Sequence, residues 1–287
     1  MNANRIVVGY DGSAEARKAV DWAAVEAERS RAQLQIVYGY HAVWPGIYYD
    51  VTAELIEAAE RDGERIVAEA VARVRVHHDG VDVIGTALHA PGAATLLDLS
   101  DVASLLVVGN RGAGGVSNLL LGSVSQQVAT HARTPVAVVR GHWDATGGPI
   151  VVGVDGSASA ELALRLAFEA AAARDTEVVA IRAYQPPSPA LIPADAAEAA
   201  ERAVLASSLA GWHERYPGVK VEALVAVGRA AKILIGASHT AQLLVVGSRG
   251  HGGFTGLLLG SVGQQLMHYA ECPVLIAHAP AAGWPTG

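Results

Sequence analysis

The sequence predicts an α/β fold that is built twice along its 287 residues. Short runs of valine, isoleucine and leucine alternate with helical stretches, a pattern typical of parallel sheets that carry helices on both faces. Residues 6–13 (IVVGYDGS) recur at 150–157 (IVVGVDGS), and the glycine-rich residues 109–123 recur at 247–261. Because the repeated unit has the size of a domain, the repeat indicates a duplication and not a solenoid.

The first half alternates expected strands with expected helices. Its first helix has apolar residues at a period of 3.6, and its second helix is long and charged with one apolar stripe. The strands are expected at residues 6–10, 34–38, 81–87, 105–108 and 136–139. The helices are expected at residues 13–31, 52–76, 92–101 and 123–131.

The second half repeats this order with a six-residue deletion in its middle, since the repeats are first 144 and later 138 residues apart. Glycines and a proline between residues 140 and 149 are typical of a linker. We therefore expect domains at residues 1–141 and 148–280. In the second domain the strands are expected at residues 150–154, 178–183, 219–225, 243–246 and 274–277. Its helices are expected at residues 158–174 and 195–216, and a further helix can begin at Ser261.

Each glycine-rich loop follows a buried strand and ends at a serine where a helix can begin. The spacing G-x2-G-x9-G-S occurs at residues 109–123 and again at 247–261. Glycines let a ligand approach the backbone amides closely, and a helix N-terminus offers unpaired N–H groups and the positive end of its dipole. The sequence therefore predicts a phosphate-binding loop in each half, although neither loop matches the Walker P-loop or the dinucleotide GxGxxG.

Asp11 and Asp155 follow the first strand of each half, in the matching segments VGYDGS and VGVDGS. A carboxylate at the carboxyl end of a parallel strand can accept hydrogen bonds from a ribose or bind magnesium. The residues Asp, Gly and Ser are also common in turns, and an aspartate can cap the helix that follows. The pairing of each aspartate with a glycine loop favours the ligand interpretation, and the turn stays the alternative.

With these motifs the chain resembles the ATP-binding type of the universal stress protein family. That family's signature is G-x2-G-x9-G-[S/T] after the fourth strand, together with an aspartate after the first. Both halves carry the signature, and the resemblance covers nearly the whole chain. It implies two tandem universal-stress-protein-like domains, each a five-stranded parallel sheet in the order 3-2-1-4-5 with helices on both faces. It also implies ATP as the ligand, with Mg²⁺ bound beside the nucleotide left open.

The resemblance also assigns roles to residues. Asp11 and Asp155 would hold the ribose, and Gly39 and Ala183 would meet the adenine through their backbone. Gly9 and Gly153 would leave room for the nucleotide. The glycine loops would hold ribose and phosphates through Gly109, Asn110, Arg111, Gly112, Gly114, Gly115, Gly122, Ser123 and Val124, and through Gly247, Ser248, Arg249, Gly250, Gly252, Gly253, Gly260, Ser261 and Val262. For the two arginines, pairing with phosphate and pointing to solvent are equally open.

Composition narrows the function classes. The net charge of −7 without a basic cluster argues against a nucleic-acid surface, and no apolar run reaches the roughly 18 residues that a membrane span needs. The N-terminus lacks a signal-peptide layout, and the single cysteine, Cys272, precludes an internal disulfide, which together favour the cytoplasm. No GxSxG, HExxH or CxxC motif occurs, so we assign no catalytic and no metal-binding residue.

The sequence favours a cytosolic ATP-binding stress-response protein with one nucleotide site per domain, which signals to an unidentified protein partner and is not a fast enzyme. The alternative is a slow ATPase or phosphotransferase, although no lysine or general base accompanies the loops. Loss of ligand binding is a third interpretation, against which the intact glycines argue. Residues 136–139 and 274–277 would be open edge strands, so we expect the halves to pair as an intrachain pseudo-dimer. A homodimer of two chains is left open.

Overall fold

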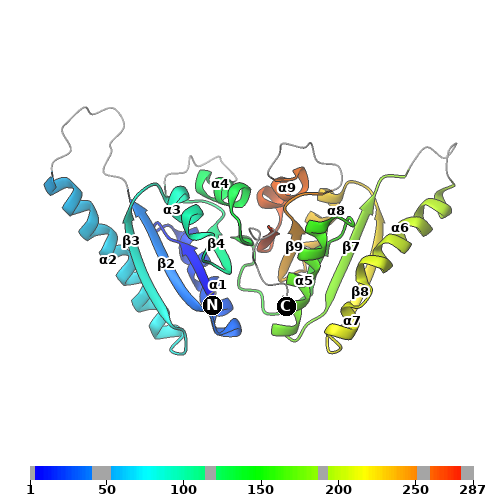
Figure 1. The fold of residues 1–287 in the computed structure, drawn as a ribbon, viewed down its shortest axis with the longest axis horizontal. Coiled ribbons are helices and arrows are strands. Elements are labelled where there is room, and N and C mark those ends of the chain that lie inside the picture. Colours follow the sequence, from blue (N-terminus) through cyan, green and yellow to red (C-terminus); the bar gives the residue numbers. More distant parts are fainter. Residues whose placement is uncertain (1–3, 41–52, 114–120, 187–192, 251–258, 279–287) are drawn as a thin grey trace. The chain divides into compact units, whose positions relative to one another are not determined.

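The computed structural model of the chain describes residues 4–40, 53–113, 121–186, 193–250 and 259–278. The described residues divide into two compact units, one up to Val139 and one from Arg140 to His278. Figure 1 shows both units, and each is described here by itself.

The first unit is an open parallel sheet whose strands alternate with helices. Its strands are joined in the order β3-β2-β1-β4-β5, every pair being parallel. In chain order the elements are β1 (Arg5–Gly9), α1 (Ala14–Ser30), β2 (Gln33–Tyr40), α2 (Ala53–His77), β3 (Val83–His89), α3 (Gly92–Leu99), β4 (Leu105–Gly109), α4 (Ser123–His131) and β5 (Val136–Val139).

The second unit repeats this arrangement, with its strands in the order β8-β7-β6-β9-β10. Its elements are β6 (Ile150–Gly153), α5 (Ala158–Ala173), β7 (Val178–Tyr184), α6 (Ala194–Leu209), α7 (Trp212–Arg215), β8 (Val221–Val227), α8 (Ala230–Ala237), β9 (Leu243–Gly247), α9 (Ser261–Tyr269) and β10 (Val274–Ala277). In both units the predicted order 3-2-1-4-5 is confirmed.

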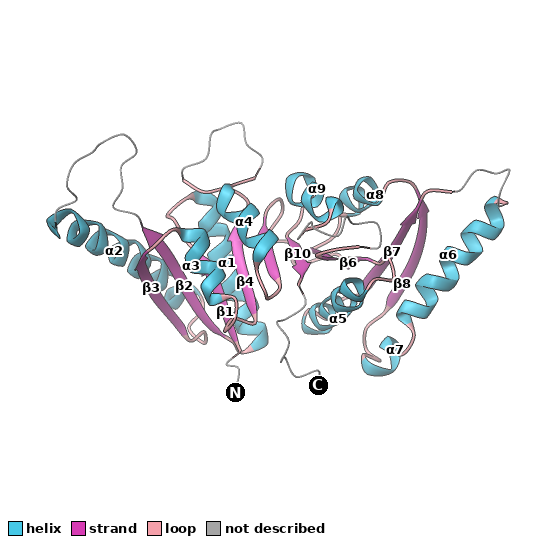
Figure 2. Ribbon diagram, turned by 45° about the horizontal axis from the view of Figure 1, so that its top comes forward, coloured by secondary structure: helices cyan, strands magenta, loops and turns pink. Residues whose placement is uncertain are grey.

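Helices cover both faces of each sheet (Figure 2). The chain moves from β1 outward to β3, then returns through β4 to β5, and right-handed crossovers place the helices of these two paths on opposite faces. Accordingly α1 contacts α2 in the first unit, whereas α3 contacts α4. The second unit pairs α8 with α9 in the same way.

The helices of the second unit differ from the expected ones at two places. The helix expected at 195–216 is interrupted after Leu209, because Gly211 has φ of 78° and α7 begins only at Trp212. A positive φ of this kind suits glycine and ends a regular helix. The structure also contains α8 (Ala230–Ala237), a helix that the sequence analysis did not identify.

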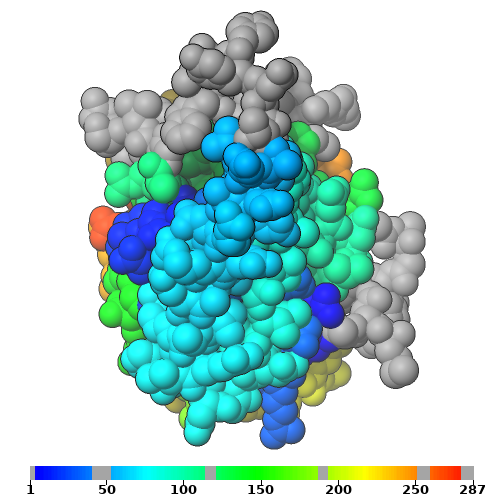
Figure 3. Space-filling view, turned by 90° about the vertical axis from the view of Figure 1, so that its left-hand side faces the viewer, coloured from blue at the N-terminus to red at the C-terminus, as the bar shows by residue number. Residues whose placement is uncertain are grey.

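The core is built from the strands and from small residues on the helices. The side chains of Val7, Val8, Leu106 and Val107 are buried in the first sheet. Helix α1 turns an alanine-rich stripe inward, and α5 does the same, which lets both helices approach their sheets closely. Figure 3 shows the outward side of α2. On this helix the exposed Arg65 pairs with Asp62 and Glu69. Among the described helices none is long and apolar enough to span a membrane.

Cys272 lies two residues before β10, inside the second unit. It has no exposed surface, and burial raises the pKa of its thiol from 9.0 to about 12. The thiolate is the reactive form of cysteine, so this side chain is chemically protected while the domain is folded.

We expect a thiol reagent at pH 8 to label Cys272 in the native chain far more slowly than in the same chain unfolded in guanidinium chloride. The raised pKa also makes stability fall with pH. The thiol's contribution is complete below the unfolded pKa near 9 and is lost as pH rises toward about 12, because only the unfolded state releases the proton there. Native labelling at the rate of the unfolded chain would contradict the burial.

Candidate functional site

Each unit has a cavity at the carboxyl ends of its strands. The strand order reverses between β1 and β4 in the first unit and between β6 and β9 in the second, and such switch points leave a crevice for ligands in open α/β sheets. The cavity volumes are about 350 Å³ in the first unit and about 480 Å³ in the second. Both aspartates and both described parts of the glycine loops line these cavities.

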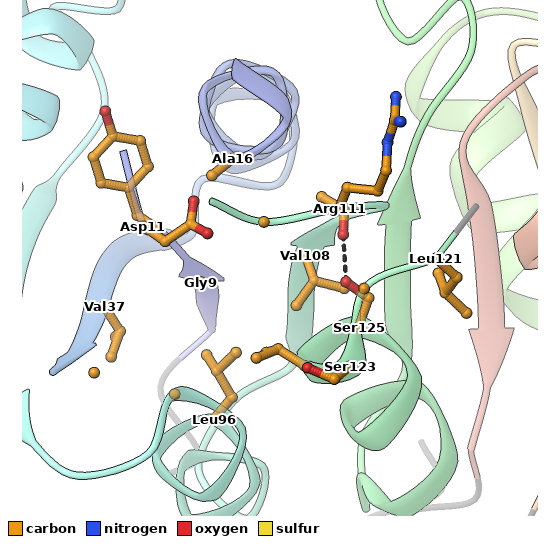
Figure 4. Close-up of a pocket in the computed structure, with 17 residues that line it drawn as sticks. Gly9, Asp11, Ala16, Val37, Leu96, Val108, Arg111, Leu121, Ser123 and Ser125 are labelled. Carbon is orange, nitrogen blue, oxygen red and sulfur yellow. Dashed lines mark hydrogen bonds between the residues drawn. The ribbon is translucent and has the colours of Figure 1, made fainter. Parts of the chain in front are cut away.

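Figure 4 shows the first cavity, which combines an apolar floor with a few polar groups. Leu96 and Val108 lie at its base, and the carboxylate of Asp11 points toward the open space from the end of β1. The first turn of α4 supplies Ser123, Val124 and Ser125. The cavity therefore has a hydrogen-bond acceptor, the Asp11 carboxylate, on one side and the N-terminus of α4 on another.

Asp11 is neither free nor a helix cap. Its Oδ1 accepts from the Ser13 N–H (3.0 Å), and its Oδ2 accepts from the Ala113 N–H in the glycine loop (2.6 Å). The cap of α1 is Ser13, whose hydroxyl accepts from the Ala16 N–H at 3.1 Å. The carboxylate therefore joins the β1 turn to the glycine loop, and ligand binding would add to this role and not replace it.

The second unit has the same turn. Oδ1 of Asp155 accepts from the Ser157 N–H at 3.0 Å, and the Ser157 hydroxyl caps α5 by accepting from the Ala160 N–H at 3.2 Å. In both units, therefore, the aspartate accepts from the amide of the turn, and a separate serine side chain caps the helix that follows.

The helices that follow the glycine loops begin without side-chain caps. The N-cap residues are Gly122 for α4 and Gly260 for α9, and neither has a side chain that could accept from the first-turn amides. In the described part of the first unit, the N–H groups of Ser123 and Val124 have no protein partner. Unpaired amides at the positive end of a helix favour an anion such as a phosphate.

The glycines of the site serve different purposes. A Cβ on Gly109 would lie 2.8 Å from the backbone of Glu15, so this glycine lets β4 approach α1. A Cβ on Gly39 would lie 2.7 Å from Cα of Gly92, which indicates close backbone packing. Gly9 leaves room for Leu96, since its Cβ would lie 2.8 Å from Cδ1 of that leucine.

Gly112 and Gly250 make space for the aspartates. A Cβ on Gly112 would lie 2.5 Å from Oδ2 of Asp11, and one on Gly250 would collide with Oδ2 of Asp155. By contrast, a Cβ on Gly260 has its nearest neighbour at 3.6 Å, and φ of −70° there is open to any residue. The fold itself does not require glycine at position 260.

The remaining expected site residues fall into four groups. Arg111 and Arg249 line the cavities, but Arg111 directs its guanidinium away from the cavity in Figure 4. Asn110 and Ser248 are buried, and their carbonyls accept from the N–H groups of Gly122 and Gly260. Outside the described residues lie Gly114, Gly115, Gly252 and Gly253. Also lining the cavities are Gly153, Ala183, Gly247, Ser261 and Val262 in the second unit.

The structure adds cavity residues that the sequence analysis did not identify. Leu96 and its counterpart Leu234 come from α3 and α8. Ser125 fixes α4 through a hydrogen bond from its hydroxyl to the Gly109 carbonyl at 2.6 Å. Arg182 and Glu201 line the second cavity, and the described lining of the first cavity has no equivalent charged pair. No motif marks this charged pair, but an alignment of the two halves would have shown it.

Comparisons with known proteins identify the family. The family model of the universal stress protein family matches residues 2–140 and 148–278. A universal stress protein of Mycobacterium tuberculosis is 37% identical over 285 residues, covering 95% of this chain and 96% of that protein. One of Mycolicibacterium smegmatis is 38% identical over 283 residues, covering 94% and 96%.

Solved structures of this family share the fold. The crystal structure of a universal stress protein from Archaeoglobus fulgidus has a TM-score of 0.72 and 18% identity, covering 96% of each chain. A universal stress protein solved in complex with cAMP is 30% identical, covers 49% of this chain and 99% of its own, and has a TM-score of 0.39.

The distinction between a glycine that the packing requires and one that it does not can be tested by measuring stability in the absence of ligand. We expect Gly109→Ala to lower the free energy of unfolding by about 1–3 kcal/mol, because its methyl group meets backbone that cannot move away. Gly260→Ala, at a position where the fold has room, should lower it by less, by at most about 1 kcal/mol, because alanine is a poorer N-cap residue than glycine. Urea unfolding of the nucleotide-free chain measures both, and equal losses would refute the distinction.

Proposed function

The chain belongs to the universal stress protein family, and from the geometry of its two cavities we propose that it binds one ATP in each domain and acts by ligand-dependent signalling. The proposed domains are residues 1–141 and 148–280. The observation that carries the proposal is the recurrence, in both units, of a strand-end aspartate facing a glycine loop and a helix N-terminus without a side-chain cap.

The cavity has the order of groups that a nucleotide needs. The N-terminus of α4 follows β4, Asp11 follows β1, and Gly39 lies near the end of β2. Neighbouring strands are about 4.8 Å apart, so the three features span roughly 10 Å in the order β4, β1, β2. A phosphate at α4, a ribose at Asp11 and a base beside Gly39 fit this sequence of groups.

The apolar floor supports the same assignment. Leu96, Val108 and Val37 line the first cavity, and Leu234, Val246 and Ile181 line the second. A flat base and a ribose can bury against such side chains, while the few polar groups set the orientation. Where Mg²⁺ accompanies the nucleotide, it would bind with the phosphates.

The alternative is a slow ATPase or phosphotransferase. Phosphoryl transfer depends on charged groups positioned around the transferred phosphate. Purified chain incubated with ATP and magnesium separates the two functions. Turnover well above roughly 1 per second would place the protein among ordinary enzymes and overturn the signalling proposal. A protein partner that receives the signal, pairing of the two domains and pairing of two chains stay predictions.

Asp11→Asn and Asp155→Asn test the aspartates while sparing the turn. Asparagine keeps the oxygen that accepts from Ser13 or Ser157 but loses the charge and one acceptor. We expect ATP affinity at the changed site to fall about 10-fold or more, since hydrogen bonds to charged groups contribute about 1.5–3 kcal/mol. Calorimetric titration should show two sites in the unchanged chain and one strong site in each variant.

The apo melting temperature of the same variants is the control. A loss of stability in both variants with unchanged ATP affinity would show that the aspartates only build the turn. Absence of any ATP binding by the unchanged chain would overturn the proposed function itself.

Gly260→Ala tests the loop on a position where the fold has room. Its methyl group would stand where a phosphate approaches the α9 amides, so we expect weaker ATP binding at the second site with only the small loss of stability of a poorer N-cap residue. The first site should bind ATP as before. Unchanged affinity at both sites would remove Gly260 from the proposed site.

A further inference from the structure

The two cavities differ by a paired exchange of side chains. By their pairing to β1 and β6, Val37 and Ile181 are equivalent, so Tyr38 corresponds to Arg182. Gly63 on α2 corresponds to Glu201 on α6, because both precede the equivalent buried residues Val67 and Leu205 by four positions. Tyr38 and Gly63 of the first unit are thus replaced by Arg182 and Glu201 in the second.

In the first unit the pair is an aromatic contact. A Cβ on Gly63 would lie 3.2 Å from Cδ1 of Tyr38 and equally far from Cδ1 of Tyr40, so the glycine lets α2 pack over these rings. The Tyr38 and Tyr40 rings are stacked with centroids 6.4 Å apart. Neither Tyr38 nor any residue of α2 lines the first cavity as described.

In the second unit the pair is an ion pair on the cavity wall. Nε of Arg182 donates to Oε2 of Glu201, and both side chains line the cavity together with Ala183 and Tyr184. Their side chains are 15% and 26% exposed. Within the described structure, Oε1 of Glu201 and the terminal nitrogens of Arg182 have no protein partner.

The ion pair is not required by the fold, since the first unit builds the same strand and helix without it. Withdrawing two charges from water costs free energy that one contact between them repays only in part. Groups that stay unpaired beside a cavity are available to a ligand. Because they lie at the β7 end, away from the α9 N-terminus, they face the end of the cavity that the proposed function assigns to the base.

We propose that Arg182 and Glu201 determine the base specificity of the second cavity by hydrogen bonding to the edge of a 6-aminopurine nucleotide. Oε1 of Glu201 accepts from the 6-amino group, and a terminal nitrogen of Arg182 donates to the neighbouring ring nitrogen N1. A carboxylate beside a guanidinium offers this acceptor and donor side by side. The first unit has Tyr38 and Gly63 at these positions, and among its described residues no such side-chain pair lines the cavity. This inference rests on the proposed nucleotide function.

The test compares ATP with purine riboside triphosphate, which lacks only the 6-amino group. Each cavity is measured alone by calorimetry in the 287-residue chain, with Asp11→Ala weakening the first or Asp155→Ala the second. We expect the preference for ATP to be roughly ten-fold or more greater in the second cavity than in the first. Equal preferences would overturn the inference.

Glu201→Gln, made in the chain that carries Asp11→Ala, should reduce this extra preference by roughly ten-fold or more. Glu198→Gln is the matched control, because Glu198 lies on the same helix, pairs with the exposed Arg202 and does not line the cavity. The double variant Arg182→Tyr/Glu201→Gly should make the second cavity behave as the first, and melting temperatures show whether each variant is folded.

Two results separate the inference from the function beneath it. If ATP binds both cavities but Glu201→Gln changes the preference no more than Glu198→Gln does, the inference fails and the nucleotide function stands. If ATP binds neither cavity, the proposed function fails.

Discussion

The close approach of a strand end to the first turn of a helix is the constraint on which the site depends. At Gly109 the backbone of β4 lies so near Glu15 that no side chain fits between them. This contact brings the glycine loop over the β1 turn, where Asp11 can accept from Ala113. In the second unit Gly247 has the same place beside Ser159. The carboxylate, the loop and the following helix are therefore parts of one packed structure.

This packing leaves the backbone amides in the first turn of α4 without a side-chain acceptor. The turn amide of Ser13 is paired with Asp11, and the first turn of α1 is capped by the serine hydroxyl. The first turn of α4 has no such cap, and Ser125 instead fixes the helix from its inner side through the Gly109 carbonyl. A helix that is held firmly but not capped is a preorganised anion site, since its amides need no rearrangement to meet a phosphate.

The fold was predictable where the signal is local. Runs such as residues 105–108 and 243–246 became β4 and β9 with shifts of one residue, and the strand order is that of the resembled family. The break at Gly211 and helix α8 were missed, because a single positive φ and a short apolar stretch have weak periodic signals. At the site, sequence spacing suggested the aspartates and loops. It could not show that Gly9 accommodates Leu96, since that contact depends on how α3 packs.

Duplication explains how the cavities can differ without loss of the fold. Exchanging Tyr38 alone for arginine would remove its stacking on Tyr40 without supplying the glutamate that pairs with Arg182 in the second unit, and exchanging Gly63 alone would drive a side chain into the Tyr38 and Tyr40 rings. The two positions are therefore coupled, because each single change costs free energy that the second recovers. The second unit holds both changes, Arg182 and Glu201, and its cavity is the larger of the two. In the rest of the cavity, the aspartate, the glycine loop and the helix without a side-chain cap recur in both units. The part that would hold ribose and phosphate is thus shared, while the part that would meet the base has diverged.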